Sequence, residues 1–148
     1  MSSSRPGNGS SFQRGGTDGG LGLATVLVLD DEPSVRGGLA RYLENHGYTS
    51  LQAGTFDEAV KCLQNCHICA VILDVRLPGA KSGLDVLAQL RSLPTHDAIP
   101  AIVVTGGVLT EREERAVAKY RAHLFYKPEG FSALVGFLKQ LMGRDQPH

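Results

Sequence analysis

The chain has 148 residues and carries 15 Lys plus Arg against 15 Asp plus Glu, so its formal net charge is zero. A hydrophobic fraction of 42% and a charged fraction of 20% are typical of one globular domain. The balance of charges lacks the basic excess of a general nucleic-acid binder, and no apolar run reaches the roughly 18 residues that a membrane helix needs. We therefore expect no direct nucleic-acid binding by this domain and no membrane insertion.

The two ends of the chain differ in composition from its middle. Residues 1–22 are rich in Ser and Gly and have no apolar run, which predicts a disordered tail and excludes a secretory signal peptide. We expect a folded domain at residues 23–142 and a short C-terminal tail at 143–148. The three cysteines, Cys62, Cys66 and Cys69, are odd in number and close together, unlike a disulfide framework, so a reducing cytoplasm is the simplest location.

The first predicted unit is a strand followed by a helix. The apolar run Thr25–Leu29 predicts a strand buried on both faces, and it ends at Asp30-Asp31-Glu32-Pro33. Ser34 is the predicted N-cap of the next helix, which Asn45-His46-Gly47 ends.

The same alternation continues to the end of the chain. Further strands are predicted at residues 48–52, 70–73, 99–104 and 124–126, each followed by a helix. The predicted helices are one capped by Thr55, one at 84–93, one from a Thr110–Glu113 capping box to about Arg121, and one at 131–141. Five strands alternating with five helices predict an α/β fold, in which a parallel sheet carries helices on both faces.

Polar side chains gather at the ends of these strands. Asp30 and Asp31 end the first strand, Asp74 the third, Thr105 the fourth and Lys127 the fifth. In open parallel sheets, ligands bind outside the carboxyl ends of the strands. Three carboxylates that meet there repel one another and need a cation, and oxygen ligands suit Mg²⁺, with Mn²⁺ as a substitute. A carboxylate beside such an ion can accept a phosphoryl group, whose oxygens the Thr and Lys would bind.

Four segments together resemble the receiver domain of two-component response regulators, the CheY-like family. They are Asp30-Asp31-Glu32-Pro33, Leu73-Asp74-Val75-Arg76-Leu77-Pro78-Gly79, Ile102-Val103-Val104-Thr105-Gly106 and Lys127-Pro128. The resemblance covers residues 25–142. It implies a flavodoxin-like, doubly wound, five-stranded parallel sheet with strand order 2-1-3-4-5.

The resemblance also implies a role for each strand-end residue. Asp74 corresponds to the phosphoryl acceptor, Asp31 to a direct metal ligand, and Asp30 to a ligand acting through water. The implied metal site consists of Asp30, Asp31, Asp74 and the backbone carbonyl of Arg76. Thr105 corresponds to a hydroxyl that moves toward the phosphoryl group, and Lys127 to its ion-pair partner. The peptide bond between Lys127 and Pro128 is cis in many members of the family, and we expect the same here.

The implied function is Mg²⁺-dependent transfer of a phosphoryl group from a histidine kinase or a phosphotransfer protein to Asp74. Such a domain is not an enzyme beyond its own phosphorylation and dephosphorylation. Its other partner is an output domain or target protein, and homodimerisation is common among members. Two rival functions are a pseudo-receiver, which binds proteins without being phosphorylated, and a phosphatase or phosphotransferase acting on small molecules.

The sequence departs from the family pattern in three places. Leu124 stands where an aromatic residue is usual, the loop at 78–83 is one residue longer, and Gly106-Gly107 leaves the surroundings of Thr105 open.

Two further clusters each have a functional and a structural interpretation. Cys62, Cys66, His67 and Cys69 fit either a zinc site or, more simply, small apolar side chains on a helix face. The charged run 111–115 fits either a solvated helix face or a docking surface.

Overall fold

The computed structural model describes residues 23–96, 98–127 and 130–145. Its strands are β1 (Thr25–Leu29), β2 (Thr49–Ala53), β3 (Ala70–Asp74), β4 (Ala101–Thr105) and β5 (His123–Tyr126). Its helices are α2 (Pro33–Asn45), α3 (Phe56–Asn65), α4 (Gly83–Ser92), α5 (Glu111–Lys119) and α6 (Gly130–Asp145), with a short 3₁₀ helix η2 (Pro94–His96) before β4.

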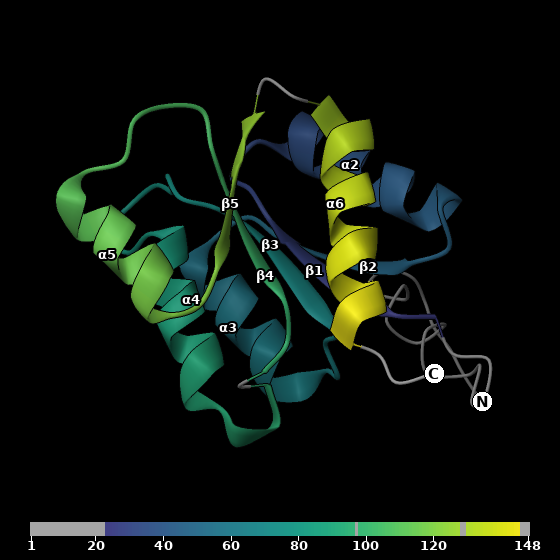
Figure 1. Ribbon diagram of the computed structural model, residues 1–148, viewed down its shortest axis with the longest axis horizontal. Coiled ribbons are helices and arrows are strands. Elements are labelled where there is room, and N and C mark those ends of the chain that lie inside the picture. Colours follow the sequence, from purple (N-terminus) through teal and green to yellow (C-terminus); the bar gives the residue numbers. More distant parts are fainter. Residues whose placement is uncertain (1–22, 97, 128–129, 146–148) are drawn as a thin grey trace.

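The five strands form one parallel sheet in the order β2-β1-β3-β4-β5 (Figure 1). All four neighbouring pairs are parallel, because each strand is followed by a helix that carries the chain back to the start of the next. The predicted fold class and strand order are confirmed. The order reverses between β1 and β3, so the carboxyl ends of these two strands flank the point where such sheets bind ligands.

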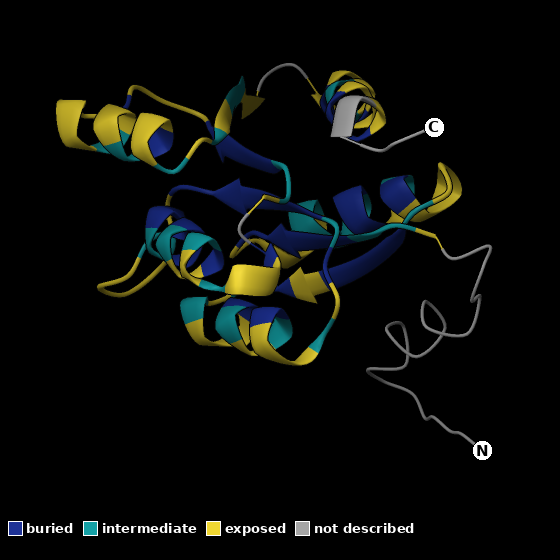
Figure 2. Ribbon diagram, turned by 60° about the horizontal axis from the view of Figure 1, so that its bottom comes forward, coloured by how far each residue is buried: buried dark blue, intermediate teal, exposed yellow. Residues whose placement is uncertain are grey.

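Each face of the sheet is covered by its own helices, as the burial pattern shows (Figure 2). Alternate residues of β1 supply the two faces: Val26 and Val28 pack on the side of α2 and α6, whereas Leu27 and Leu29 pack on the side of α3, α4 and α5. Both side-chain sets are buried, which is why the strand sequences are apolar without alternation.

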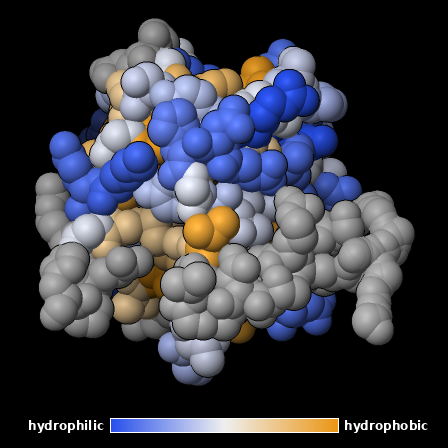
Figure 3. All heavy atoms as spheres, turned by 90° about the vertical axis from the view of Figure 1, so that its right-hand side faces the viewer, coloured by the Kyte–Doolittle hydropathy of each residue, from blue (hydrophilic) through white to orange (hydrophobic). Residues whose placement is uncertain are grey.

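The helices bury their apolar faces against the sheet and expose mainly polar residues to solvent. On the side of the molecule at the right of Figure 1, hydrophilic residues form a broad band over the described surface, with smaller hydrophobic areas beside it (Figure 3). None of the helices in the described ranges is long and apolar enough to cross a membrane.

Local signals set most helix ends. The Thr55 cap and the Thr110–Glu113 capping box are confirmed, since the N–H groups of Glu58 and Glu113 donate to the threonine hydroxyls at 3.2 and 3.1 Å. The Ser34 cap is wrong: α2 starts at Pro33, whose fixed φ suits the first helical position, so Glu32 occupies the N-cap. Gly47 follows α2 with φ of +94°, a conformation that glycine adopts without strain.

Some expectations concern residues outside the described ranges. These are the disordered tail at 1–22, residues 146–148, and the cis bond between Lys127 and Pro128, which remain predictions. At the C-terminus, α6 continues to Asp145, three residues past the expected boundary at Met142.

Candidate functional site

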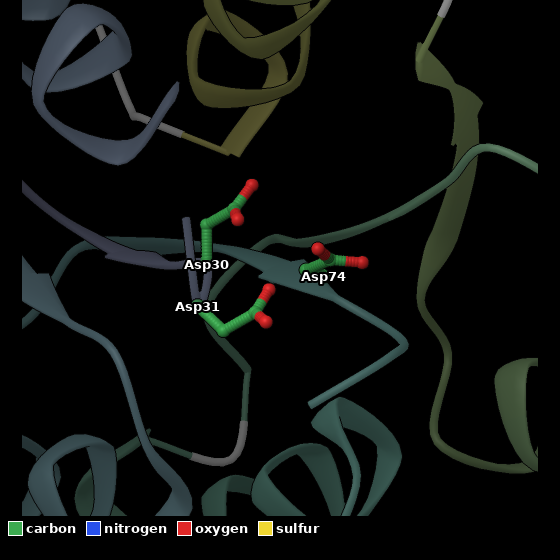
Figure 4. A group of neighbouring side chains, drawn as sticks. All are labelled: Asp30, Asp31 and Asp74. Carbon is green, nitrogen blue, oxygen red and sulfur yellow. The ribbon is translucent and has the colours of Figure 1, made fainter. Parts of the chain in front are cut away.

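Three carboxylates meet where β1 and β3 end (Figure 4). Leu29 of β1 pairs with Leu73 of β3, so Asp30 and Asp74 follow paired positions of adjacent strands. One carboxylate oxygen from each of Asp30, Asp31 and Asp74 lies within 4.8 Å of the others. Asp30 and Asp74 are buried, whereas Asp31 is exposed, so the cluster opens to solvent on one side.

Backbone groups fix the two buried carboxylates. The Oδ1 atom of Asp30 accepts a hydrogen bond from the Glu32 N–H at 2.9 Å, and the Oδ1 atom of Asp74 accepts one from the Arg76 N–H at 3.2 Å. Arg36 of α2 also donates from Nη1 to the Asp30 carbonyl at 2.8 Å. Sequence reasoning gave Arg36 no role, because its partner is a backbone atom that no motif marks.

Lys127 from the end of β5 reaches across the sheet edge to the carboxylates. Its Nζ atom lies 3.0 Å from Oδ2 of Asp74 and 3.9 Å from Oδ2 of Asp30. Burial raises the pKa of Asp74, and the hydrogen bond and charge of Lys127 oppose that rise without cancelling it. Desolvation lowers the pKa of Lys127, but its hydrogen bond and ion pair with Asp74 outweigh this and leave that pKa above its usual value.

The donor atoms of the acidic cluster fit a hard divalent cation. The cluster offers carboxylate oxygens and no nitrogen or sulfur, which is the ligand chemistry of Mg²⁺. Among the residues that the structure describes, this is the one group of three or more His, Cys, Asp or Glu side chains with donor atoms so close together. The arrangement is therefore compatible with Mg²⁺ binding.

Thr105 lies at the end of β4. Within the described residues, its hydroxyl forms no hydrogen bond with the three carboxylates. Its Oγ1 atom is 3.2 Å from both the carbonyl oxygen and the amide nitrogen of Gly107. The side chain is buried, with 2% exposure. The structure therefore brings together four of the five predicted strand-end side chains and holds the Thr105 hydroxyl in its own loop.

Gly83 packs directly against the backbone of Asp74, a contact that the sequence analysis did not predict. It is the first residue of α4, and its N–H donates to the Val75 carbonyl at 3.0 Å. A Cβ atom at position 83 would lie 1.9 Å from the backbone oxygen of Asp74. Ser82 and Asp85 lie on either side of Gly83 and form a capping box, a spacing that signals where α4 begins but not how closely Gly83 approaches Asp74.

Arg76, two residues after Asp74, forms an ion pair with Glu113 of α5. Both guanidinium Nη atoms donate to the Glu113 carboxylate. The predicted capping box identified Glu113, but nothing in the sequence indicated a partner 37 residues away. The charged run at 111–115 therefore has two kinds of contact: Glu111 and Arg115 pair along the exposed helix face at 3.8 Å, whereas Glu113 pairs with Arg76.

A cavity of about 270 Å³ adjoins the carboxylates between α2, the sheet and α6. Its described lining is mostly apolar and also includes Asp30, Glu32, Asp74 and Lys127.

Among the described residues, the cysteine cluster is not one of the groups whose donor atoms lie close enough together to hold a metal ion. Cys62 and Cys66 are free, half-buried and packed against the core on the α3 side, and burial raises the pKa of both thiols. His67 is exposed. These contacts support the interpretation of Cys62 and Cys66 as small apolar side chains.

The sequence matches a known family. A sequence model described as "Response regulator receiver domain" matches residues 26–139, more than half of the chain. The transcriptional regulatory protein AruR of Pseudomonas aeruginosa is 40% identical over 86 residues, which cover 55% of this chain and 34% of that protein. The response regulator MprA of a Mycobacterium species is 32% identical over 122 residues, covering 82% and 52%. This chain therefore spans about a third to a half of these relatives.

Solved structures share the fold. A CheY-like receiver domain protein from Methanospirillum hungatei superposes with a TM-score of 0.76 at 22% identity, covering 82% of this chain and 95% of that chain. The response regulator TrrA from Thermotoga maritima, solved in complex with Mg²⁺ and BeF, has a TM-score of 0.67 at 28% identity, covering 80% and 99%. Given this fold, the strand-end carboxylates and the match over residues 26–139, the chain belongs to the receiver domain family of response regulators.

Proposed function

We propose that this receiver domain is a phosphoryl-accepting switch. In this proposal the Asp74 carboxylate takes a phosphoryl group from the phosphohistidine of a histidine kinase or a phosphotransfer protein. The observation that supports it best is the convergence of Asp30, Asp31 and Asp74 within 4.8 Å, with the Lys127 ammonium 3.0 Å from the acceptor.

The transfer is a displacement at phosphorus. An Asp74 oxygen forms the new O–P bond as the N–P bond of phosphohistidine breaks, and the imidazole keeps the electron pair and takes a proton from water. Each Asp74 oxygen accepts one hydrogen bond, and a carboxylate oxygen has two lone pairs, so one on each oxygen remains free to attack. Lys127 binds a phosphoryl oxygen, and Thr105 turns from Gly107 to bind another.

The acidic cluster would hold Mg²⁺ through Asp31 directly, through Asp30 by way of water, and through Asp74 and the Arg76 carbonyl. When bound, the ion offsets the repulsion between the carboxylates and the incoming phosphoryl group. TrrA, a relative at 28% identity, was solved with Mg²⁺ and BeF. Mn²⁺, which has similar ligand preferences, should substitute.

The relatives support the proposed partners, because the matched region makes up only 34% of AruR and 52% of MprA. We propose that the protein is cytoplasmic. One partner is a histidine kinase or a phosphotransfer protein, and the other is an output domain or target protein. The protein catalyses only its own phosphorylation and dephosphorylation, without turning over a small substrate. Homodimerisation of the domain belongs to the same proposal.

The first test is the intact mass of the protein after incubation with acetyl phosphate, with and without Mg²⁺, beside Asp74→Asn. One Mg²⁺-dependent phosphoryl adduct that is absent from the variant is the expected result. No adduct, and no binding of beryllofluoride, would instead support the pseudo-receiver. Continuous release of phosphate without an adduct would support a small-molecule phosphatase. Mn²⁺ replaces Mg²⁺ in a parallel incubation.

A further inference from the structure

Arg76 contacts both the phosphoryl acceptor and helix α5. Its backbone N–H donates to Oδ1 of Asp74 at 3.2 Å. Its guanidinium forms two hydrogen bonds with Glu113 in the first turn of α5, one of them from Nη2 to Oε1 at 3.2 Å. One residue therefore joins the end of β3 to a helix that begins 35 residues later in the chain, at Glu111.

Glu113 has a second task that does not depend on Arg76. Its Oε1 atom accepts the Thr110 N–H at 2.9 Å, and the Thr110 hydroxyl accepts the Glu113 N–H at 3.1 Å. This capping box satisfies two N–H groups at the start of α5. Glu113 can therefore lose Arg76 and still cap the helix, so the ion pair is separable from the fold of α5.

Arg76 can exchange the Glu113 carboxylate for another anion at little cost in stability. The Arg76 side chain is 58% exposed, and ion pairs in contact with solvent contribute little to stability. A guanidinium binds phosphate oxygens with the same two-pronged geometry as a carboxylate. A phosphoryl group on Asp74 would offer about two negative charges, where Glu113 offers one.

We propose that Arg76 exchanges partners: it binds Glu113 when Asp74 is free and a phosphoryl oxygen when Asp74 is phosphorylated. This inference rests on the proposed function. Glu113 then has two effects on the switch. It competes with the incoming anion for the guanidinium, and its release frees the first turn of α5 from the β3–α4 loop.

The test uses Glu113→Gln, which removes the charge and keeps the cap, because glutamine also forms a capping box. The matched control is Glu111→Gln, which makes the same charge change in the same helical turn. Glu111 pairs only along the helix surface, at 3.8 Å from Arg115, with both side chains exposed. Urea denaturation of both variants verifies that α5 and the rest of the fold are intact.

The readout is the beryllofluoride concentration that half-saturates the protein in Mg²⁺, followed by ¹⁹F NMR. We expect Glu113→Gln to lower this concentration about two- to fivefold, the scale of a solvent-exposed ion pair. Glu111→Gln should leave it unchanged. In the background of Arg76→Gln, the Glu113→Gln change should have no further effect, since the contested guanidinium is gone.

Amide hydrogen exchange supplies an independent readout. Beryllofluoride should speed exchange in the first turn of α5 in the wild type and not in Arg76→Gln. Equal effects of Glu113→Gln and Glu111→Gln, or a gain that persists without Arg76, would overturn the partner exchange. If the wild type takes up phosphoryl groups, but Glu113→Gln does not lower the half-saturating concentration and exchange in α5 does not speed up, this inference alone fails. If the wild type takes up neither phosphoryl groups nor beryllofluoride, the proposed function fails with it.

Discussion

The strand-end site has two halves that are built differently. The acidic half consists of Asp30, Asp31, Asp74 and Lys127, whose charged atoms converge in the structure. The hydroxyl half consists of Thr105, Gly106 and Gly107, in which the hydroxyl bonds within its own loop. Strand pairing sets the first half, because Asp30 and Asp74 follow paired residues of adjacent strands. A side-chain rotamer sets the second half.

This difference separates what is fixed from what can move. Moving the acidic half would require the strands to shift in register, which would turn buried faces outward. Moving the Thr105 hydroxyl requires a rotation about one bond and the loss of hydrogen bonds to one residue. A switch that responds to a new group on Asp74 therefore has its rigid part in the carboxylates and its adjustable part in the loop after β4.

The largest predicted effect concerns the backbone that supports the acidic half. Gly83→Ala would place a Cβ atom 1.9 Å from the Asp74 carbonyl oxygen, a clash with backbone that no side-chain rotation relieves. We expect it to destabilise the protein by about 3 kcal/mol or more, measured by urea denaturation.

Gly37→Ala is the matched control, since a Cβ atom there meets nothing within 4 Å. This substitution inside α2 should stabilise by about 0.5–1 kcal/mol. A neutral Gly83→Ala would mean that Asp74 does not depend on close packing of α4.

The sequence predicted the acidic half because it depends on regular structure. Apolar runs located the strands, and the rule for parallel sheets placed Asp30, Asp74 and Lys127 at one edge. The Thr110–Glu113 cap is equally local and was also found. Local reasoning failed at two helix ends: Pro33 rather than Ser34 began α2, and α6 continued past Met142 to Asp145.

What the sequence left open depends on contacts between distant residues. The Arg76–Glu113 pair joins residues 37 apart, and the approach of Gly83 to Asp74 depends on how α4 packs on the sheet. Neither is encoded by spacing. The Thr105 rotamer was also beyond prediction, because the family resemblance concerns the phosphorylated state as well as the free one and does not choose between them.

Mg²⁺ should stabilise the folded protein if the acidic half binds it. At a concentration one hundred times the dissociation constant, the gain is about 2.7 kcal/mol. Thermal unfolding in EDTA and in Mg²⁺ measures it. Asp31→Asn should lose most of the gain, whereas Glu32→Gln, which alters the next exposed acid, should keep it. A gain that survives in Asp31→Asn would place the ion elsewhere.

The pH dependence of Asp74→Asn tests the electrostatics of the acidic half without metal. Burial raises the pKa of Asp74 in the folded state, so its charged form is disfavoured there. The contribution of protonated Asp74 to folding stability is fully present below its unfolded pKa of about 3.9. It is lost as the pH rises through the higher pKa of the folded state. The Asn side chain of the variant does not titrate, so Asp74→Asn does not lose this stability as the pH rises.

In EDTA at pH 7 we therefore expect Asp74→Asn to be more stable than the wild type, by up to about 1 kcal/mol. The advantage should vanish as the pH falls below the ordinary range of Asp. Urea denaturation between pH 3 and 7 gives both values, with circular dichroism to verify the folded state at each pH. A variant less stable at pH 7 would show that the ion pair with Lys127 outweighs the burial of Asp74.

The smallest effect on stability is expected in the hydroxyl half, from Thr105→Val. Valine keeps the volume and suits a strand, so the loss is limited to the hydrogen bonds with Gly107, about 1 kcal/mol or less. The functional effect should be larger than the structural one. Beryllofluoride should still bind in Mg²⁺, because the acidic half is intact, but amide exchange after β4 should no longer respond to it. If the variant responds like the wild type, the Thr105 hydroxyl is a loop cap and the adjustable part of the switch lies elsewhere, with Arg76 as the next residue to test.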